Sequence, residues 1–308
     1  MTAKTDAQAQ RSNTDYSRRA AFLDRDNFYI QSPPGFAAHA FLAERERALD
    51  PRGPTGYIAL DYRNALGTEW PATTPLMLAR YGRVRARDSL ASRFYASAEM
   101  YYVISGAGES RNRQDAIRWR AGDVFCFPGG EKTVHTAGEE NALLWCVTNE
   151  PLLAFDGLAP RADARLVAPV HYLAEDIDAN LARTQAAEAA KGGASNGNGV
   201  FMFSSTGCVE RRRLPFPSLT LAMNSLAPGN AQRPHRHNAV ALTLVLEAEA
   251  CHSLIDGARH DWLEHAALIT PPGQMHSHYN QGGKLARLLI AQDSGMHYYC
   301  RTPGFSHT

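Results

Sequence analysis

The sequence predicts an all-β dominated fold that contains two similar antiparallel barrels. Two blocks, residues 75–151 and 217–303, consist of short runs rich in β-branched and aromatic residues, separated by Gly, Pro, Asn and Asp. Each block carries a Pro-x-Gly turn, at Pro128–Gly130 and at Pro271–Gly273. The repeated turn indicates a divergent internal repeat, and the lack of a helical pattern inside each block favours a sandwich or barrel.

The domain organisation follows from these blocks. A chain of 308 residues favours two domains, at roughly 150 residues per domain. Helix formers run from Ala174 to Lys191 and precede a glycine-rich stretch, which predicts a helical connector and a flexible loop. We therefore expect an N-terminal arm and helical segment over 1–74, a first barrel over 75–155, a connector over 156–216 and a second barrel over 217–308.

Composition excludes several classes of partner. The 32 Lys+Arg and 31 Asp+Glu residues nearly balance, so we expect no nucleic-acid partner. No apolar run reaches the ~18 residues of a membrane span, and the N-terminus lacks the apolar core of a signal peptide. The cysteines form no CxxC pair, which favours buried free thiols in a reducing cytoplasm. They are Cys126, Cys146, Cys208, Cys251 and Cys300.

Histidines gather in the second block, where nine of the chain's twelve lie after residue 234. His235 and His237 form an H-x-H pair, and on a strand both imidazoles share one face. A Pro-x-Gly turn delivers His276 from a separate strand. Three imidazoles could bind one metal at ~2.0–2.1 Å, leaving open positions for other ligands. The pattern predicts a metal site of His235, His237 and His276.

These two halves match the two cupin motifs, G-x5-H-x-H and P-x-G-x2-H-x3-N. We therefore expect two cupin (double-stranded β-helix, or jelly-roll) barrels with helical N-terminal and connecting segments. The motif commonly has a Glu four or five positions after its second histidine, where this chain has Ala241 and Leu242. The expected ligand set is three neutral imidazoles without a carboxylate.

The first block keeps the scaffold of the motifs without their ligands. Ser92 and Phe94 stand among the residues that fill the H-x-H region, and Thr133 stands at the third ligand position. His135 falls two residues later. We expect this first cupin to be free of metal.

The segment 234–282 resembles the metal-binding cupin of gentisate 1,2-dioxygenase-like enzymes. The similar features are the P-H-R-H-x-x-x-A-L run, the missing motif Glu and a closing H-x-H-x-N. The resemblance implies a bicupin that uses Fe(II) and O2 to cleave the ring of a small hydroxylated aromatic substrate, with His235, His237 and His276 as iron ligands. It also implies a catalytic role for His278, in contact with substrate or oxygen.

The resemblance predicts the substrate contacts less closely than it predicts the metal ligands. An Arg that meets the substrate carboxylate in that family is replaced here by Thr243, which lacks a charged fork. Other polar residues at strand ends or beside the motif are candidates to replace it. The predicted substrate-binding residues are Asn224, Arg233, Thr243, Arg287 and Gln292, with Arg236 as a further candidate cation.

Alternative functions remain open at this point. The leading prediction is a mononuclear non-haem Fe(II) dioxygenase acting on a gentisate- or salicylate-like compound. The alternatives are a cupin isomerase, lyase or hydrolase that uses Zn, Mn or Ni without O2, and a non-catalytic metal- or ligand-binding cupin. Exposed sheet edges and apolar faces predict a homo-oligomer, a dimer or a tetramer.

Overall fold

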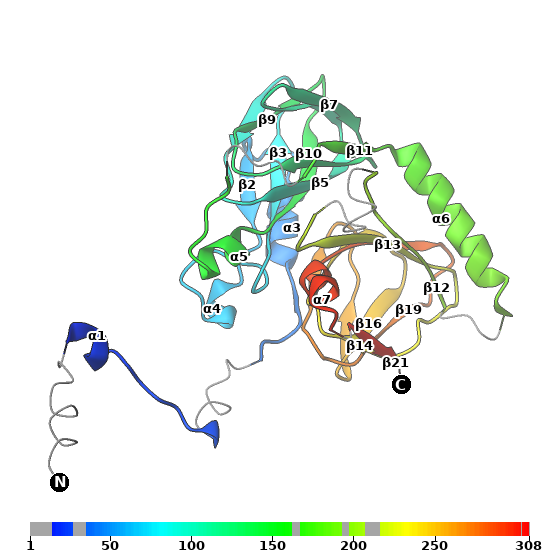
Figure 1. Cartoon of the computed structure of the whole chain (residues 1–308). Helices are drawn as coiled ribbons and strands as arrows, with labels where there is room; N and C mark the ends of the chain where they lie inside the picture. The colour runs from blue at the N-terminus through cyan, green and yellow to red at the C-terminus, as the bar shows by residue number, and fades with distance from the viewer. Residues whose placement is uncertain are drawn as a thin grey trace, which may run out of the picture. The chain divides into compact units, whose positions relative to one another are not determined.

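The computed structural model describes residues 14–26, 35–161, 167–192, 197–206, 216–302 and 304–307. The chain divides into two compact units, Met1–Gly35 and Phe36–Thr308. The first unit contains the short helix α1 (Asp15–Arg18), in which the Thr14 side chain accepts a hydrogen bond from the backbone of Ser17. Both barrels belong to the second unit (Figure 1).

The first barrel consists of two antiparallel sheets. The larger has the strand order β11-β8-β5-β10-β3-β2 and the smaller has the order β4-β9-β6-β7. Buried side chains from both sheets meet in one core, which includes Tyr101, Trp119 and Phe125. The strands are β2 (Gly56–Ala59), β3 (Leu78–Val84), β4 (Ser89–Ser92), β5 (Ala98–Ser105), β6 (Ala107–Asn112), β7 (Asp115–Arg120), β8 (Val124–Pro128), β9 (Thr133–Ala137), β10 (Ala142–Thr148) and β11 (Val170–Tyr172).

The second barrel repeats this plan. Its larger sheet has the order β1-β18-β15-β20-β13-β12 and its smaller sheet the order β17-β16-β19-β14-β21. Its core includes Val245, Trp262 and Leu288. The strands are β1 (His39–Ala40), β12 (Asn198–Met202), β13 (Thr220–Leu226), β14 (His235–His237), β15 (Ala241–Glu247), β16 (Cys251–Ile255), β17 (Ala258–Asp261), β18 (Ala267–Thr270), β19 (His276–Asn280), β20 (Ala286–Gln292) and β21 (Phe305–His307). Two barrels of this kind confirm the predicted fold class.

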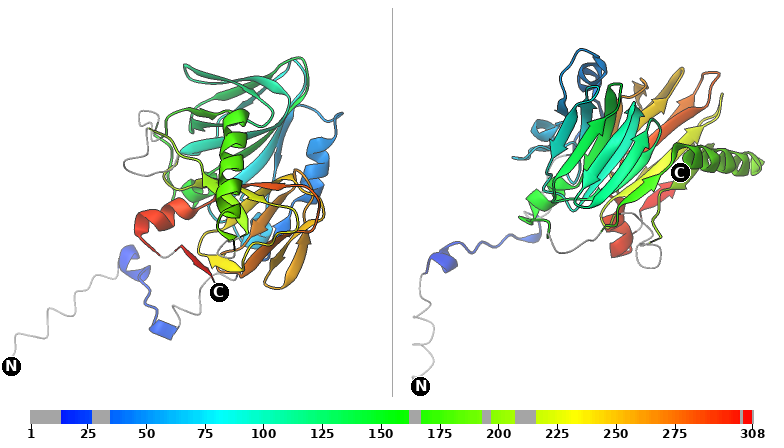
Figure 2. Two further views of the ribbon diagram at one scale, coloured as in Figure 1. Left: turned by 90° about the vertical axis from the view of Figure 1, so that its right-hand side faces the viewer. Right: turned by 90° about the horizontal axis from the view of Figure 1, so that it is seen from above.

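The larger sheets of the two barrels share a core through their outer faces (Figure 2). On β10, Trp145 belongs to this shared core, whereas Leu144 belongs to the core of its own barrel. On β20, Leu289 and Leu288 divide in the same way. Strands that bury both faces read as continuous apolar runs, which is why the sequence shows no strict alternation there.

Helices connect and flank the barrels. Helix α6 (Ala174–Ala189) buries Ile177 and Leu181 and lies against β12 and β13. That helix begins where the sequence predicted it, at Ala174, and ends at Ala189. The helices of the second unit are α3 (Leu42–Leu49), α4 (Arg63–Leu66), α5 (Glu150–Phe155), α6 (Ala174–Ala189) and α7 (Ser294–Cys300).

Four of the described strands lie outside the ranges 75–155 and 217–308 and complete the larger sheets. Strands β2 and β11 pair with β3 and β8 of the first barrel. Strand β12 pairs with β13, and β1 pairs with β18, both in the second barrel. The segment that precedes the first barrel therefore contributes a strand to the second.

The cysteines differ in burial. Cys126, Cys146 and Cys251 are buried free thiols, whereas Cys300 is exposed near the end of α7, so the expectation of burial was wrong for that residue. Cys208 lies outside the described residues. Among the described helices, none combines the length and the apolar composition that a membrane crossing requires.

Candidate metal centre

Three histidines meet on the inner face of the smaller sheet of the second barrel. Alternation along β14 buries His235 and His237 and exposes Arg236, as the H-x-H pattern predicted. Strand β19 pairs with β14 in a register that sets His276 directly opposite His235. We call these three residues the three-histidine cluster. Their candidate ligand atoms all lie within 4.8 Å of one another.

Backbone carbonyls fix the tautomer of each imidazole in the cluster. Nδ1 of His235 lies 3.0 Å from the carbonyl oxygen of Arg233, and Nδ1 of His237 lies 2.7 Å from that of Ala239. Nδ1 of His276 lies 2.9 Å from the carbonyl oxygen of Gln274. Because a carbonyl only accepts, each Nδ1 must carry the proton, which leaves a lone pair on each Nε2. This is the arrangement that a histidine-bound metal needs.

Burial keeps His237 and His276 uncharged. Burial, followed by the neighbouring His235, lowers the pKa of His276 to about 3. Burial also lowers the pKa of His237. Both rings are therefore neutral at neutral pH, and neutral imidazole is the form that binds metal. The donor set fits a divalent ion with three nitrogen ligands and further positions for exogenous ones.

The larger sheet places polar side chains on the face toward this cluster. Gln292 on β20 reaches it directly, with its Nε2 atom 3.3 Å from Nε2 of His237. Asn224 on β13 shares the inward face with Leu226, and Thr243 on β15 shares the inward face with Val245. The amide oxygen of Asn224 is buried without a hydrogen-bond partner among the described residues.

Arg287, a predicted substrate contact, lies elsewhere. It alternates with the inward-facing Leu288, so it lies on the opposite face of β20. There its guanidinium binds Asp178 of α6 at 2.6 Å and Glu247 at 3.2 Å. Arg233 is exposed just before β14, and it meets the cluster through its backbone carbonyl.

Comparisons with known proteins bear on this site. No protein-family model matches the chain. Over 122 residues the chain is 30% identical to 5-aminosalicylate 1,2-dioxygenase from a Comamonas species, a match that covers 37% of this chain and 32% of that relative. Over 82 residues it is 28% identical to gentisate 1,2-dioxygenase from a Ralstonia species, covering 27% of this chain and 23% of that relative. The matches thus span a third or less of each relative's length.

The structural match extends over the whole chain. Salicylate 1,2-dioxygenase from Pseudoaminobacter salicylatoxidans with gentisate superposes with a TM-score of 0.76 at 12% identity, covering 100% of this chain and 95% of that one. The chain has a two-cupin fold. A variant of oxalate decarboxylase from Bacillus subtilis also matches, with a TM-score of 0.56 at 14% identity over 85% of this chain and 78% of that one. The sequence relatives confirm the resemblance to gentisate 1,2-dioxygenase-like enzymes.

The two cupins share a buried Trp–Ser–His chain that places His278 beside the cluster. In the second cupin, Trp262 Nε1 donates to Ser253 Oγ at 2.8 Å, and that oxygen lies 2.8 Å from His278 Nδ1. The Ser253 hydroxyl thus bonds both the Trp262 indole and His278 Nδ1, and these contacts fix the orientation of the His278 ring. The ring centroid of His278 lies 5.7 Å from that of His276.

The first cupin contains the same chain in Trp119, Ser110 and His135. Each of these residues precedes its counterpart by the same offset that separates the two Pro-x-Gly turns. Trp119 Nε1 donates to Ser110 Oγ at 2.7 Å, and this oxygen lies 2.6 Å from His135 Nδ1. His135 is therefore the counterpart of His278 and not a displaced metal ligand. The matching tryptophans are a sequence signal that reveals this relationship, and the motif comparison missed it.

In the first cupin, the position of the third ligand holds a threonine that is hydrogen-bonded to a buried carboxyl group. Thr133 occupies the position that corresponds to His276, at the same offset as the two turns. Its hydroxyl donates to Glu99 Oε2 at 2.8 Å, and the Tyr101 hydroxyl donates to the same oxygen at 2.7 Å. Burial raises the pKa of Glu99 to about 8, so this carboxyl is neutral at pH 7.

An aromatic ring stands in the first cupin where the second histidine of the H-x-H pair would be. Phe94 corresponds to His237 at the same offset, and the Arg80 guanidinium covers its ring at 4.2 Å. A phenyl ring offers no ligand atom to a metal. Ser92 corresponds to His235 at the same offset, so the first cupin lacks all three imidazoles that define the cluster in the second.

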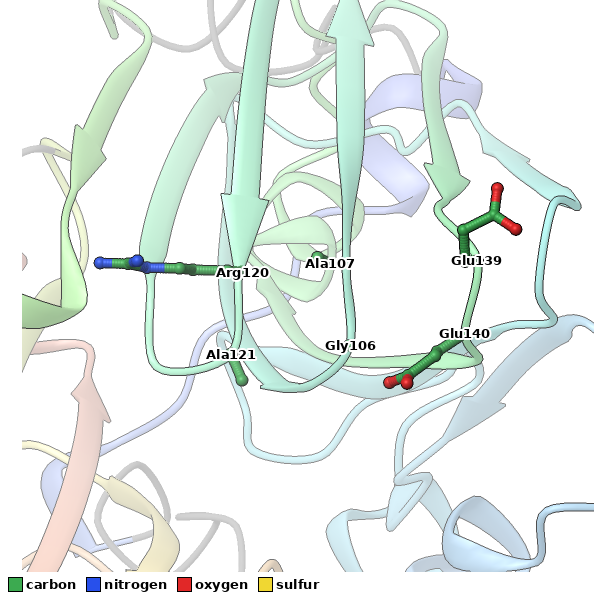
Figure 3. A pocket seen from close by; sticks show the side chains of 6 residues that line it. All are labelled: Gly106, Ala107, Arg120, Ala121, Glu139 and Glu140. Carbon is green, nitrogen blue, oxygen red and sulfur yellow. The ribbon is translucent and has the colours of Figure 1, made fainter.

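Two surface pockets lie apart from the cluster. One, of 490 Å³, opens at turns of the first cupin around Gly106, Arg120 and Glu139 (Figure 3). Arg120 and Glu139 point to opposite sides of this pocket, toward their ion-pair partners Glu175 and Arg87. The other, of 820 Å³, lies between α5 and α7 and is lined by apolar side chains that include Tyr298.

Proposed function

We propose that this bicupin is a mononuclear non-haem Fe(II) dioxygenase that cleaves the ring of a small hydroxylated aromatic compound, of the gentisate or salicylate kind. The observation that carries the proposal is the three-histidine cluster, in which every Nδ1 is bound to a backbone carbonyl, so that every Nε2 offers its lone pair as a ligand. The named sequence relatives act on 5-aminosalicylate and gentisate, which supports the same substrate class here.

The residues of the cluster would hold the metal as His235, His237 and His276. Ferrous iron held there would supply one centre at which a chelating phenol and O2 can meet. The protein's own part is to bind and orient the aromatic ring. Thr243, Asn224 and Gln292 offer neutral hydrogen-bonding groups from the inward face of the larger sheet.

His278 is the proposed catalytic side chain. Ser253 engages its Nδ1, so Nε2 is the ring nitrogen left to meet a substrate. Burial lowers the pKa of His278 well below its usual value, so the ring is neutral. In the tautomer that carries the proton on Nε2, it acts as a hydrogen-bond donor that stabilises negative charge on a substrate oxygen. Arg233 and Arg236, exposed beside the cluster, are the proposed partners of a substrate carboxylate.

Metal and oxygen-uptake measurements test the proposal. Protein purified without oxygen should contain about one equivalent of iron, and it should consume O2 when gentisate, salicylate or 5-aminosalicylate is added. His276→Ala should lose the metal, whereas His260→Ala, in the same barrel but outside the cluster, should retain it. One equivalent of zinc with no O2 uptake across this panel would show instead a cupin of the non-oxidative kind.

We also propose that the protein forms a homo-oligomer, a dimer or a tetramer, in the cytoplasm. Leu158, Met296, Tyr298 and Tyr299 are exposed and line the 820 Å³ pocket together. Gathered apolar side chains of this kind are typical of a contact surface. Light scattering should give a mass above that of one chain, and Tyr299→Glu should lower it. A monomer at micromolar concentration would contradict the proposal.

A further inference from the structure

The strand that carries two of the three cluster histidines pairs only briefly with β19, the strand that carries the third. Strand β14 is three residues long, and it pairs with β19 only through His235 and His276. On its other side it pairs with β21 through three residue pairs, which extend from His235 to His237. Figure 1 shows β21, in red, lying alongside β14. Most of the backbone pairing of β14 therefore comes from a strand that lies far along the chain, after β20 and α7.

Backbone hydrogen bonds tie the two strands together. The backbone N–H of Asn238 donates to the carbonyl of Gly304 at 3.1 Å. Bonded pairs alternate along an antiparallel ladder, so Arg236 and Ser306, which face each other, form the next bonded pair. The N–H of Ser306 thus donates to the carbonyl of Arg236, the residue between the two cluster histidines.

A side chain of β21 also holds one of the imidazoles. The ring of Phe305 stacks on that of His235, with the centroids 4.9 Å apart and an interplanar angle of 28°. A metal binds imidazole in the plane of the ring, so a stacked neighbour leaves Nε2 accessible. The contact restricts rotation of the ring and keeps water from one of its faces. Phe305 is still 53% exposed, so it lies between the cluster and solvent.

We infer that residues 304–307 are a strap that holds the H-x-H strand in its metal-binding position, and that Phe305 and the backbone of Ser306 set how long the metal stays bound. Release of the metal requires β14 to move away from β19. Local opening of this kind is governed by the few contacts that the opening breaks. Three residue pairs join β14 to the strap, against one pair with β19 and one further bond, from the N–H of Gly273 to the carbonyl of His237 at 2.8 Å. The inference rests on the proposed metal site.

The test measures the rate at which Fe(II) leaves the loaded full-length protein for a chromogenic ferrous chelator in the absence of oxygen. Phe305→Ala removes the stacked ring and should speed release by about 2- to 10-fold. Ser306→Pro removes the donor to Arg236 and should speed release by about fivefold or more. The matched control is Phe155→Ala, which removes a phenylalanine that is 72% exposed on α5 of the first cupin.

Rates equal to that of the wild-type protein in both strap variants would overturn the inference, as would an equal acceleration in the control. Because Phe305 is largely exposed, its replacement leaves the core intact, and circular dichroism checks the fold of Ser306→Pro. His276→Ala separates this inference from the proposed site. If His276→Ala loses Fe(II) while the strap variants release it at the wild-type rate, the strap is wrong and the site stands. If His276→Ala retains Fe(II), the site itself is wrong.

Discussion

Nδ1 of His278 lies 2.8 Å from the hydroxyl oxygen of Ser253, and His135 stands in the same relation to Ser110 in the other cupin, at 2.6 Å. A buried tryptophan donates to the serine in both cases. A hydrogen-bond chain that recurs in a cupin without the three-histidine cluster belongs to the scaffold of each barrel. Only in the second cupin does it also orient an imidazole beside that cluster.

Removing either serine hydroxyl should therefore destabilise the protein to a similar extent. Ser110→Ala and Ser253→Ala each leave a buried indole N–H and an imidazole nitrogen without a partner, which costs about 2–4 kcal/mol. Urea unfolding measures the loss in each variant. Oxygen uptake with the preferred aromatic substrate should fall further for Ser253→Ala than for Ser110→Ala. Equal activity in the two variants would mean that the orientation of His278 has no part in turnover.

The buried Glu99 of the first cupin makes stability depend on pH. Its pKa is raised to about 8 by burial, so the folded state binds a proton that the unfolded state releases near its ordinary value of 4.5. Stability is therefore greatest below that ordinary value and falls as pH rises toward about 8, by at most about 1.4 kcal/mol per pH unit. Glu99→Gln keeps an acceptor for Tyr101 and Thr133 and removes this contribution.

Chemical denaturation at pH 5, 6.5 and 8 checks the role of Glu99. The difference in unfolding free energy between Glu99→Gln and the wild-type protein should shift in favour of the variant as pH rises. A difference that stays constant over this range would show that Glu99 is already ionised in the folded protein.

Gln292 tests whether the inward face of the larger sheet contacts the substrate. Its amide nitrogen faces Nε2 of His237 at 3.3 Å. Gln292→Leu removes this hydrogen bond, which competes with a metal for the same lone pair, so Fe(II) should bind with equal affinity or up to about fivefold more tightly. The KM for the aromatic substrate should rise by about tenfold because a hydrogen bond to it is lost. An unchanged KM would remove Gln292 from the substrate site.

Arg287 tests the other face of β20, at which no contact with the substrate is expected. Arg287→Met breaks its ion pairs with Asp178 and Glu247, whose side chains are more than half exposed, and should change the unfolding free energy by about 1 kcal/mol or less. The KM should stay at the wild-type value, because the guanidinium lies on the face of β20 away from the cluster. A tenfold rise in KM would restore Arg287 as a substrate contact.

The sequence predicted the parts of the site that depend on local geometry. His235 and His237 needed only the alternation of a strand, and His276 needed only the turn that precedes it. The face on which Arg287 lies could not be predicted, because it depends on which side of β20 is the interior. Both faces of that strand are apolar, so periodicity does not distinguish them.

Pairing between strands that lie far apart in the sequence could not be predicted from it either. The strap and the contact between Phe305 and His235 are set by how a three-residue strand docks, and no local pattern encodes that docking. The Trp–Ser–His chain is different. Its members recur at a constant offset between the two blocks, so extending the comparison of the blocks beyond the ligand motifs would have found it.

The pairing of β1 with β18 has a consequence for how the chain reaches this structure. His39 lies opposite Ile269, so a strand made early in synthesis must wait for a partner that is made only after the whole first barrel and the connector. Such pairings raise the contact order, and high contact order slows folding. Until then the sheet edge of β1 is open to pairing with other strands. Slow refolding, and aggregation when folding is interrupted, are the behaviour that this topology leads us to expect.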